Sequence, residues 1–226
     1  MGRSRRTERD ERRRALGQNF LRDREVIDAL THGVRPGEVV VDVGAGTGAL
    51  TLPLARAGAQ VLAIEADPVW GRKLKQRVRS AGLGDRVDVV VGDLRRVQLP
   101  GPPYRVVACP PYDHTTALLR RLLDDPVTGP ERADLVLQWE VARKRAARPP
   151  TTLLSTGWAP WWEIMLVGRI PASAFRPRPT VDSGWLAVRR REPALLPAEV
   201  AGAFADFLRA RWGGWQGRGD RSGGEG

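Results

Sequence analysis

The sequence predicts an α/β fold: a mostly parallel, seven-stranded sheet with helices on both faces and a small helical segment at the C-terminus. Three observations predict it. Between residues 38 and 138, short runs rich in β-branched residues alternate with longer amphipathic runs, as in a parallel sheet covered by helices. A glycine-rich turn follows the first short run. Two later apolar runs can pair as an antiparallel end of the same sheet.

These runs give the expected order of elements. Strands are expected at Glu38–Val43, Gln60–Ile64, Arg86–Val91, Tyr104–Ala108 and Ala133–Gln138. Helices are expected between them near Leu50–Ala57, Val69–Ser80 and Thr115–Asp124. The antiparallel end is expected at Trp162–Ile170 and Val181–Arg189. Three prolines interrupt residues 171–180, so we expect a loop there with no helix in it, and a last amphipathic helix over Pro197–Trp212.

Composition limits the class of protein. With 226 residues, of which 42% are hydrophobic, the chain can build one well-formed core. Its single cysteine, Cys109, cannot form a disulfide within the chain, and with His32 and His114 it cannot supply a four-ligand zinc site, so no metal is expected. No run approaches the ~18–20 apolar residues of a membrane span, and no heptad pattern demands a partner. We expect a cytoplasmic monomer without a membrane partner.

Positive charge is concentrated at the two ends of the chain. The net charge is +11, from 37 basic and 26 acidic residues. Residues 1–24 hold nine arginines and four acids, residues 139–226 hold fourteen basic and eight acidic residues, and the stretch between them is balanced. This distribution suggests a catalytic body held on a polyanion by its ends. We expect a basic disordered arm over residues 1–15, one domain over 16–190, and a helix with a Gly/Arg-rich tail over 191–226.

The glycine-rich turn indicates a nucleoside-containing cofactor. The apolar run Val39–Val43 leads into Gly44-Ala45-Gly46-Thr47-Gly48. Glycines at such a turn let the backbone approach a ligand closely and adopt angles that other residues resist. Glu65 follows at the end of the second expected strand, where its carboxylate can accept hydrogen bonds from both hydroxyls of a ribose.

The choice of cofactor depends on the acids around this turn. The glycine spacing also fits a dinucleotide-binding fingerprint, which keeps a nicotinamide-dependent oxidoreductase as an alternative. Asp42, Glu65 and Asp93, however, would repel a pyrophosphate and suit a cationic cofactor. S-adenosylmethionine carries a sulfonium and an ammonium group, and Asp93 could accept a hydrogen bond from its adenine.

A third signal follows the fourth expected strand, at Cys109-Pro110-Pro111-Tyr112. Two prolines cannot continue a strand ladder or enter a helix interior, so they fix an extended turn at the carboxyl edge of the sheet. Tyr112 is thereby expected to lie over the cofactor crevice. Its ring can stack on a flat substrate such as a nucleobase.

The C-terminal third carries an RNA-binding signal. Seven of the eight tryptophans lie beyond residue 138, interleaved with arginines that include Arg143, Arg145 and Arg148. Such a surface can stack on bases and contact phosphates. Trp162 and Trp185 alternate within strand-like runs, and for these two we expect core packing.

Taken together, the motifs resemble those of the ribosomal RNA adenine N6-methyltransferases in order and spacing. The matching segments are Gln18-Asn19-Phe20-Leu21, Val41–Gly48, Ile64-Glu65, Gly92-Asp93-Leu94, the Pro-Pro-Tyr turn and Phe175–Ser183. The similarity covers about residues 16–190 and is specific as a set. The short chain and its small basic C-terminal portion resemble the macrolide-resistance (Erm-type) enzymes, which modify an adenine of 23S rRNA.

The resemblance implies a class I S-adenosylmethionine-dependent methyltransferase with a Rossmann-like domain, whose residues 139–190 face the RNA. It implies N6-methylation of an adenine in 23S rRNA, protein-free or in an early assembly intermediate, and macrolide-type resistance. The implied cofactor-binding residues are Gln18, Asn19, Leu21, Gly44, Gly46, Glu65, Asp93, Leu94 and Cys109. The implied catalytic residues are Cys109, Pro110 and Tyr112. The expected RNA-binding residues are Arg143, Arg145, Arg148, Phe175 and Arg176. Of these, Phe175 would approach the second face of the adenine.

One position departs from the family pattern, which usually has asparagine where this chain has Cys109. The asparagine oxygen, with the carbonyl of the next residue, would accept hydrogen bonds from the adenine amino group, and a thiol is a poor acceptor. The chain could be a slow or mono-methylating enzyme, could have changed its substrate, or could bind RNA without methylating it. A fourth hypothesis makes Cys109 a nucleophile toward a pyrimidine carbon, which requires a nearby cation such as His114 or Arg105.

Overall fold

The structure, a computed structural model, describes residues 19–216, with side chains to Trp212. The expected arm over residues 1–15, Gln18 and the end of the tail lie outside the described residues. Within the described range, no helix is long and apolar enough to cross a bilayer.

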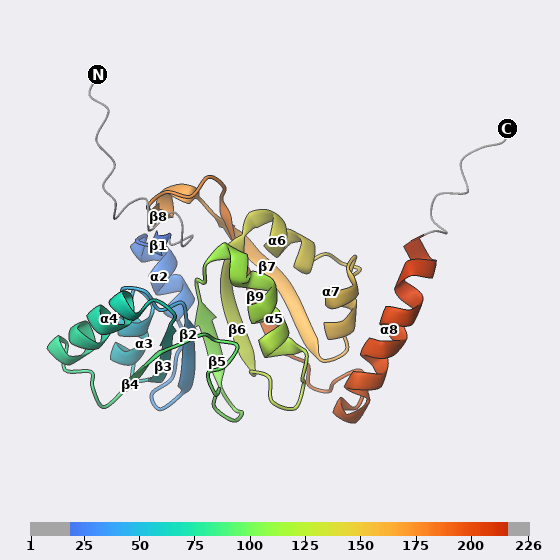
Figure 1. Cartoon of the computed structure of the whole chain (residues 1–226), viewed down its shortest axis with the longest axis horizontal. Helices are drawn as coiled ribbons and strands as arrows, with labels where there is room; N and C mark the ends of the chain where they lie inside the picture. The colour runs from blue at the N-terminus through green and yellow to red at the C-terminus, as the bar shows by residue number, and fades with distance from the viewer. Residues whose placement is uncertain (1–18, 217–226) are drawn as a thin grey trace, which may run out of the picture.

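A seven-stranded sheet in the order β4-β3-β2-β5-β6-β9-β7 forms the centre of the molecule (Figure 1). Five strands are parallel, and β9 lies antiparallel between β6 and β7. The strands are β2 (Val39–Val43), β3 (Gln60–Glu65), β4 (Val87–Val91), β5 (Arg105–Ala108), β6 (Arg132–Gln138), β7 (Trp162–Ile170) and β9 (Ser183–Arg190). The predicted mostly parallel sheet with an antiparallel end is therefore confirmed.

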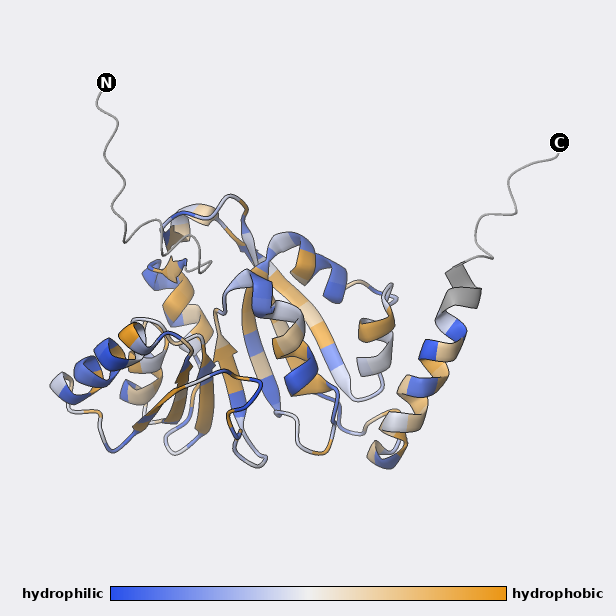
Figure 2. Cartoon of the chain, viewed as in Figure 1, coloured by the Kyte–Doolittle hydropathy of each residue, from blue (hydrophilic) through white to orange (hydrophobic). Residues whose placement is uncertain are grey.

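Helices cover both faces because successive strand residues point in opposite directions. In β2, Val40 packs into one core cluster, whereas Val41 and Val43 pack into the other. The first face is covered by α2 (Arg24–Thr31), α3 (Thr51–Arg56) and α4 (Pro68–Ser80). The second is covered by α5 (Thr115–Leu123), α6 (Trp139–Arg145), α7 (Leu153–Trp158) and α8 (Ala201–Gln216). Figure 2 shows hydrophobic strands between these layers and a hydrophilic outer side on α4.

The expectation of a loop without helix over residues 171–180 was wrong. The 3₁₀ turn η2 (Ala172–Ala174) is followed by the short strand β8 (Phe175–Arg176). Strand β8 pairs antiparallel with β1 (Phe20–Leu21), which places Leu21 opposite Phe175. Prolines exclude a helix interior, but a single turn between two of them remains possible. Strands β1 and β8 lie some 155 residues apart in the chain, and neither short segment carries a sequence pattern that indicates its pairing partner.

Three helices and one helix start also differ from the sequence-based expectation. We did not predict α2, α6 or α7, each of which has eight residues or fewer. Short segments of this kind show little periodicity, and tertiary packing stabilises them. The last helix was expected from Pro197, but α8 begins at Ala201 because the 3₁₀ turn η3 (Ala198–Val200) precedes it.

A buried ion pair joins the middle of the sheet to α2. The Arg105 Nη2 atom lies 2.9 Å from Asp134 Oδ2, and both side chains are almost fully excluded from solvent. Arg105 also donates to the backbone carbonyls of Leu30 and His32, so most of its donors have partners. Asp134 in turn accepts a hydrogen bond from Trp185 Nε1 at 3.0 Å. Burial lowers the pKa of Arg105, although Asp134 opposes this shift.

The two tryptophans expected in the core pack against it. Trp162 is 1% exposed and donates from Nε1 to the carbonyl of Leu123 at 3.1 Å. Trp185 is half-buried against the first core cluster. The expected core role of both residues is confirmed.

Substitution of Asp134 tests the buried ion pair. Asp134→Ala leaves the Arg105 guanidinium buried without its counter-charge, so the free energy of unfolding should fall by about 3–5 kcal/mol. Urea denaturation of the full chain measures it. Asp88→Ala on the exposed side of β4 is the matched control, for which we expect a change below ~0.5 kcal/mol. Equal effects of the two substitutions would contradict the assigned role of the pair.

Candidate active site

The main cavity lies where the strand order reverses, between β2 and β5. From β2 the chain proceeds outward through β3 and β4, whereas β5 and β6 extend the sheet the other way. Loops after diverging parallel strands leave a crevice at their carboxyl ends. The cavity measures about 490 Å³. The lining residues that concern the site are Asn19, Phe20, Gly44, Gly46, Glu65, Asp93, Leu94, Arg95, Cys109, Pro110, Tyr112, His114 and Phe175.

One predicted cofactor residue within the described range, Leu21, is not part of this lining. Gln18 lies outside the described residues, and Leu21 is 3% exposed, packed into the first core cluster. The neighbour of Leu21, Phe20, lines the cavity instead. Phe20 stands edge-on to Trp70 with ring centroids 4.9 Å apart. Phe20 belongs to the Gln18–Leu21 motif, but the sequence indicated no role for it, because two residues are too few to show which side chain of a short strand faces the cavity.

The turn after β2 requires glycine at two positions. Gly44 and Gly46 have φ angles of 75° and 52°, a region that side chains disfavour. A Cβ on Gly44 would lie 3.2 Å from Pro110 Cα, and a Cβ on Gly46 would lie 2.8 Å from the ring of Phe20. These glycines bring the backbone of the turn against the Pro-Pro loop and leave space at the carboxyl edge.

Glu65 ends β3 and accepts two backbone hydrogen bonds. Its Oε2 accepts from Gly46 N at 2.7 Å, and its Oε1 accepts from Asp67 N at 2.8 Å. Each carboxylate oxygen has a second lone pair, so both remain able to accept a hydroxyl hydrogen. Burial raises the pKa of Glu65, because the charged form loses solvation. A partly desolvated carboxylate of this kind fits the two hydroxyls of a ribose.

Asp93 lies on the exposed rim of the cavity with a different environment. Arg95 donates from its side chain and its backbone N–H, with Nε 2.9 Å from Asp93 Oδ2. This side-chain bond is the main reason that the pKa of Asp93 is lowered to about 2. The carboxylate is therefore ionised, and any bond to a cofactor amino group is shared with Arg95. We did not predict Arg95, since only the folded turn brings the two residues together.

Asp42 is not among the residues that line the cavity, although we expected it around the cofactor. It is 1% exposed, and Thr51 donates from Oγ1 to Asp42 Oδ2 at 2.6 Å. Burial, with the nearby charge of Glu65, raises the pKa of Asp42 to about 7. Asp42 thus anchors the start of α3 behind the glycine turn.

The Pro-Pro-Tyr segment forms the opposite wall. Tyr112 begins the 3₁₀ turn η1 (Tyr112–His114) and lies half-buried, with its hydroxyl 2.7 Å from Ser183 Oγ. Burial of Cys109, with the charge of Asp42, raises the pKa of its thiol to about 12. Arg105, one of the cations considered for Cys109, is bound to Asp134. Cys109 therefore remains a neutral thiol, which argues against the nucleophile hypothesis.

The sequence matches a known protein family over most of its length. A family model described as "Ribosomal RNA adenine dimethylase" matches residues 9–211. The chain belongs to the ribosomal RNA adenine dimethylase family. It is 39% identical over 189 residues to an rRNA adenine N-6-methyltransferase of Corynebacterium diphtheriae, covering 83% of this chain and 72% of that protein. It is 40% identical to mycinamicin-resistance protein MyrB of Micromonospora griseorubida, covering 87% of this chain and 62% of MyrB.

A solved structure agrees with the family assignment. The crystal structure of the 23S rRNA methyltransferase ErmE matches with a TM-score of 0.76 and 30% identity, over 89% of this chain and 81% of that one. As a dimethylase-family protein, the chain is an rRNA adenine N6-methyltransferase with a class I methyltransferase fold, which uses S-adenosylmethionine. The predicted family, fold and cofactor are confirmed. The nicotinamide alternative loses its support.

The residues present fit S-adenosylmethionine. Gly44 and Gly46, which we call the cofactor cradle, line the cavity with backbone that carries no side chain, and Glu65 offers acceptors for a ribose. Asp93 adds a negative charge at the rim, suited to a cofactor with positive charge. The fit to the cofactor is therefore argued from the residues of this dimethylase-family chain and not from its relatives.

Three of the four arginines predicted to bind RNA have partners in the protein. The Arg143 side chain pairs with Glu140, and Arg148 Nη2 lies 2.9 Å from Glu163 Oε1. Arg145 Nη1 donates to Thr152 Oγ1 at 2.9 Å. Among the five residues expected to bind RNA, the structure places Phe175 in the cavity lining, and Arg176 is exposed on β8.

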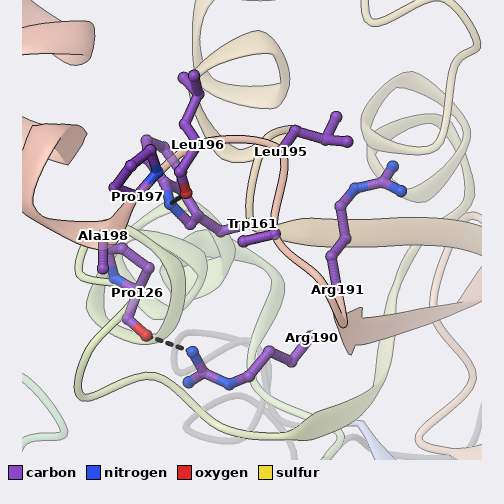
Figure 3. A pocket seen from close by; sticks show the side chains of 9 residues that line it. Pro126, Trp161, Arg190, Arg191, Leu195, Leu196, Pro197 and Ala198 are labelled. Atoms are coloured by element: carbon purple, nitrogen blue, oxygen red, sulfur yellow. Dashed lines mark hydrogen bonds between the residues drawn. The ribbon is translucent and has the colours of Figure 1, made fainter.

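A second cavity, of about 360 Å³, lies at the other end of β9 (Figure 3). The guanidinium groups of Arg190 and Arg191 donate there to backbone carbonyls, and Trp161 Nε1 donates to the carbonyl of Leu196 at 2.9 Å. These polar groups already have partners inside the protein and hold the segment before α8. We assign no ligand to this cavity.

Gly46→Ala tests the cofactor cradle. The new methyl group would push against Phe20, so binding of S-adenosylhomocysteine should weaken by on the order of 10-fold, as measured by calorimetry. Gly37→Ala is the matched control, because Gly37 also has a positive φ, of 80°, but no atom lies within 4 Å of an added Cβ. Gly37→Ala should lose stability and keep its affinity. Equal affinities for both variants would refute the proposed cradle.

Asp42→Asn tests the buried carboxyl group. Because the folded state holds the Asp42 proton up to about pH 7 and the unfolded state releases it near pH 4, wild-type stability falls as the pH rises through this window. Asparagine does not titrate. The stability of Asp42→Asn relative to wild type should therefore rise by on the order of 2 kcal/mol between pH 5 and pH 8. Urea denaturation at both pH values measures it, and a constant difference would contradict the shifted pKa.

Proposed function

We propose that the chain transfers methyl groups from S-adenosylmethionine to N6 of an adenine in 23S rRNA. The observation that carries the proposal is one cavity in which a ribose-binding carboxylate, Glu65, and a half-buried aromatic side chain, Tyr112, are both present. The similarity to the 23S rRNA methyltransferase ErmE favours the large-subunit RNA over other RNAs. We further propose that the protein acts in the cytoplasm as a monomer, on protein-free RNA or an early assembly intermediate.

In the proposed complex, the chain binds the cofactor with residues from four loops. Glu65 accepts hydrogen bonds from the ribose hydroxyls, and the Gly44–Gly46 backbone borders the cofactor. Asp93, which is also bound by Arg95, accepts a hydrogen bond from the adenine amino group. Asn19 and Leu94 complete this side of the cavity. The cofactor supplies an activated methyl group: a bond forms from adenine N6 to the methyl carbon as the sulfonium–methyl bond breaks, and N6 loses a proton to water.

The other side of the cavity would receive the target base. Tyr112 stacks on the adenine, which is worth ~1–3 kcal/mol per stacked base and favours an unpaired, extruded nucleotide. Phe175 approaches from β8. The carbonyl of Pro110 accepts a hydrogen bond from the N6 amino group and directs its lone pair toward the methyl group. Catalysis here consists chiefly of holding two reactants in line.

The RNA around the target adenine would contact the basic surface beside the cavity. Arg143, Arg145 and Arg148 exchange their present partners for phosphates, and Arg176 extends this surface on β8. Arginine suits phosphate because its planar donor fork forms bidentate contacts. Exposed ion pairs such as Arg143–Glu140 are worth ~0–1 kcal/mol, so a phosphate can replace Glu140 readily.

Cys109 limits this reaction in the proposal. A protonated thiol offers little hydrogen-bond acceptance to the amino group, so Pro110 alone orients it. We therefore propose slow or mono-methylating activity, with macrolide-type resistance as the consequence if the target adenine lies where such drugs bind. A binding protein without turnover is the second candidate, and the same observation at Cys109 favours it.

The test is methyl transfer from radiolabelled S-adenosylmethionine to protein-free 23S rRNA, followed by mass-spectrometric identification of the modified nucleoside. The proposal expects N6-methyladenine or N6,N6-dimethyladenine. Label on a pyrimidine would refute it and would reinstate Cys109 as a nucleophile. Cofactor binding without any label on 23S rRNA would favour a different RNA or the binding protein.

Cys109→Asn should increase the rate. The amide oxygen restores an acceptor for the adenine amino group, and one such aligned contact is commonly worth on the order of 10²-fold in kcat. We expect an increase of roughly 10- to 100-fold in single-turnover methylation, with a larger dimethyl fraction. Cys109→Ala is the control, since it removes the thiol without adding an acceptor and should stay near wild type. An asparagine variant no faster than the alanine variant would exclude the missing contact as the limitation.

A further inference from the structure

The aromatic side chains of the cavity come from segments outside the main sheet. Tyr112 lies in the single turn η1, and Phe175 lies in the two-residue strand β8. Neither segment takes part in the seven-stranded ladder that fixes the loops after β2 and β3. Other contacts must hold these two rings.

Ser183 holds Tyr112. Its Oγ lies 2.7 Å from the Tyr112 hydroxyl, 71 positions away in the chain, and the serine is fully buried. Ser183 is the first residue of β9 and pairs with Gln138, the last residue of β6. Because β9 runs antiparallel to β6, its beginning reaches the edge of the sheet where the parallel strands end. The serine hydroxyl is thereby fixed by the central sheet, and the tyrosine ring is fixed by the serine.

Asp182 holds the segment that carries Phe175. Its Oδ1 accepts a hydrogen bond from Ala172 N at 2.8 Å, and its Oδ2 accepts one from Arg169 Nε at 2.8 Å. Ala172 begins η2, which leads directly into Phe175. The bond from Ala172 is the main cause of a lowered pKa of Asp182, so the carboxylate is ionised near neutral pH. Bonds to an ionised acceptor are stronger than bonds between neutral groups.

We propose that Asp182 and Ser183 are positioning residues that set the two aromatic walls of the base-binding slot. Asp182 acts through η2 on Phe175, and Ser183 acts through its hydroxyl on Tyr112. This inference rests on the proposed function, since the slot is assigned to the target adenine. Two adjacent residues at the start of β9 thus fix the positions of Tyr112 and Phe175 relative to the sheet. A change at either residue should therefore alter how the base is held.

The chain offers a direct readout of the Ser183 contact, because it has two tyrosines, Tyr104 and Tyr112. Tyr104 donates from its hydroxyl to the carbonyl of Thr128 and serves as an internal reference. In protein labelled with ¹³C at the tyrosine ring, Ser183→Ala should shift the Tyr112 resonance and leave the Tyr104 resonance in place. An unchanged Tyr112 resonance would overturn the contact, whatever RNA the protein modifies.

Kinetics then test whether the contact positions the base. Loss of the hydrogen bond that holds Tyr112 should lower kcat/KM for 23S rRNA by on the order of 10-fold in Ser183→Ala, with unchanged affinity for S-adenosylhomocysteine. In a Tyr112→Phe background, where the contact is already broken, Ser183→Ala should cost little more. Ser183→Thr retains a hydroxyl and should restore most of the rate. Equal losses in both backgrounds would show that Ser183 acts by another route and would overturn the proposal for it.

Asp182 has its own matched pair of variants. Asp182→Asn keeps an acceptor oxygen for Ala172 N, whereas Asp182→Ala keeps none. We expect Asp182→Ala to raise KM for the RNA by roughly 10-fold and Asp182→Asn to raise it less. Equal KM values for Asp182→Ala and wild type would overturn the role of Asp182.

The outcomes separate the two proposals. Absence of methylation by wild type would refute the proposed 23S function, while the Tyr112 resonance would still decide the Ser183 contact. Methylation by wild type with no loss in Ser183→Ala would refute the positioning role and leave the proposed function intact.

Discussion

The close approach of the turn after β2 to the loop after β5 is the constraint on which the rest of the site depends. Gly44 donates to the carbonyl of Ile64 on β3, while a Cβ added to it would lie 3.2 Å from Pro110 Cα, which is a tight contact. This contact occurs at the point where the strand order reverses. With the turn displaced, Glu65 would lose its bond from Gly46, and Tyr112 would no longer share a cavity with it.

The acids near the site occupy two kinds of electrostatic environment. Burial raises the pKa of Glu65 and of Asp42, whereas the bond from Arg95 lowers the pKa of Asp93, which is partly exposed. Of these carboxylates, Asp93 at the rim is the one most readily ionised, because a charged group costs least free energy where solvent reaches it. A carboxylate in the interior gains more from a hydroxyl donor than one in water, which suits Glu65 to a ribose. The two roles assigned to these acids follow from their burial.

The C-terminal half of the domain serves the site by supplying support to residues that come earlier in the chain. Strand β9 inserts between β6 and β7, and its first residues reach the carboxyl edge of the sheet. Strand β8 pairs with β1, so the N-terminal Phe20 and the late Phe175 border the same cavity. Hydrogen bonds from Arg105 on β5 and from Trp185 on β9 to the buried Asp134 on β6 join these three strands. The antiparallel end of the sheet thus supports residues that line the cavity.

The sequence by itself determined the α/β class, the five parallel strands, the glycine turn and the roles expected of Glu65 and Tyr112. These features are local: β-branched runs fix the strands, glycines mark the turn, and parallel strands bring their carboxyl ends to one edge. Only the tertiary structure decided the pairing of β1 with β8, the withdrawal of Asp42 from the cavity, the Asp93–Arg95 contact and the support of Tyr112 by Ser183. Long-range pairings and burial depend on residues far apart in the chain, and no local pattern encodes them.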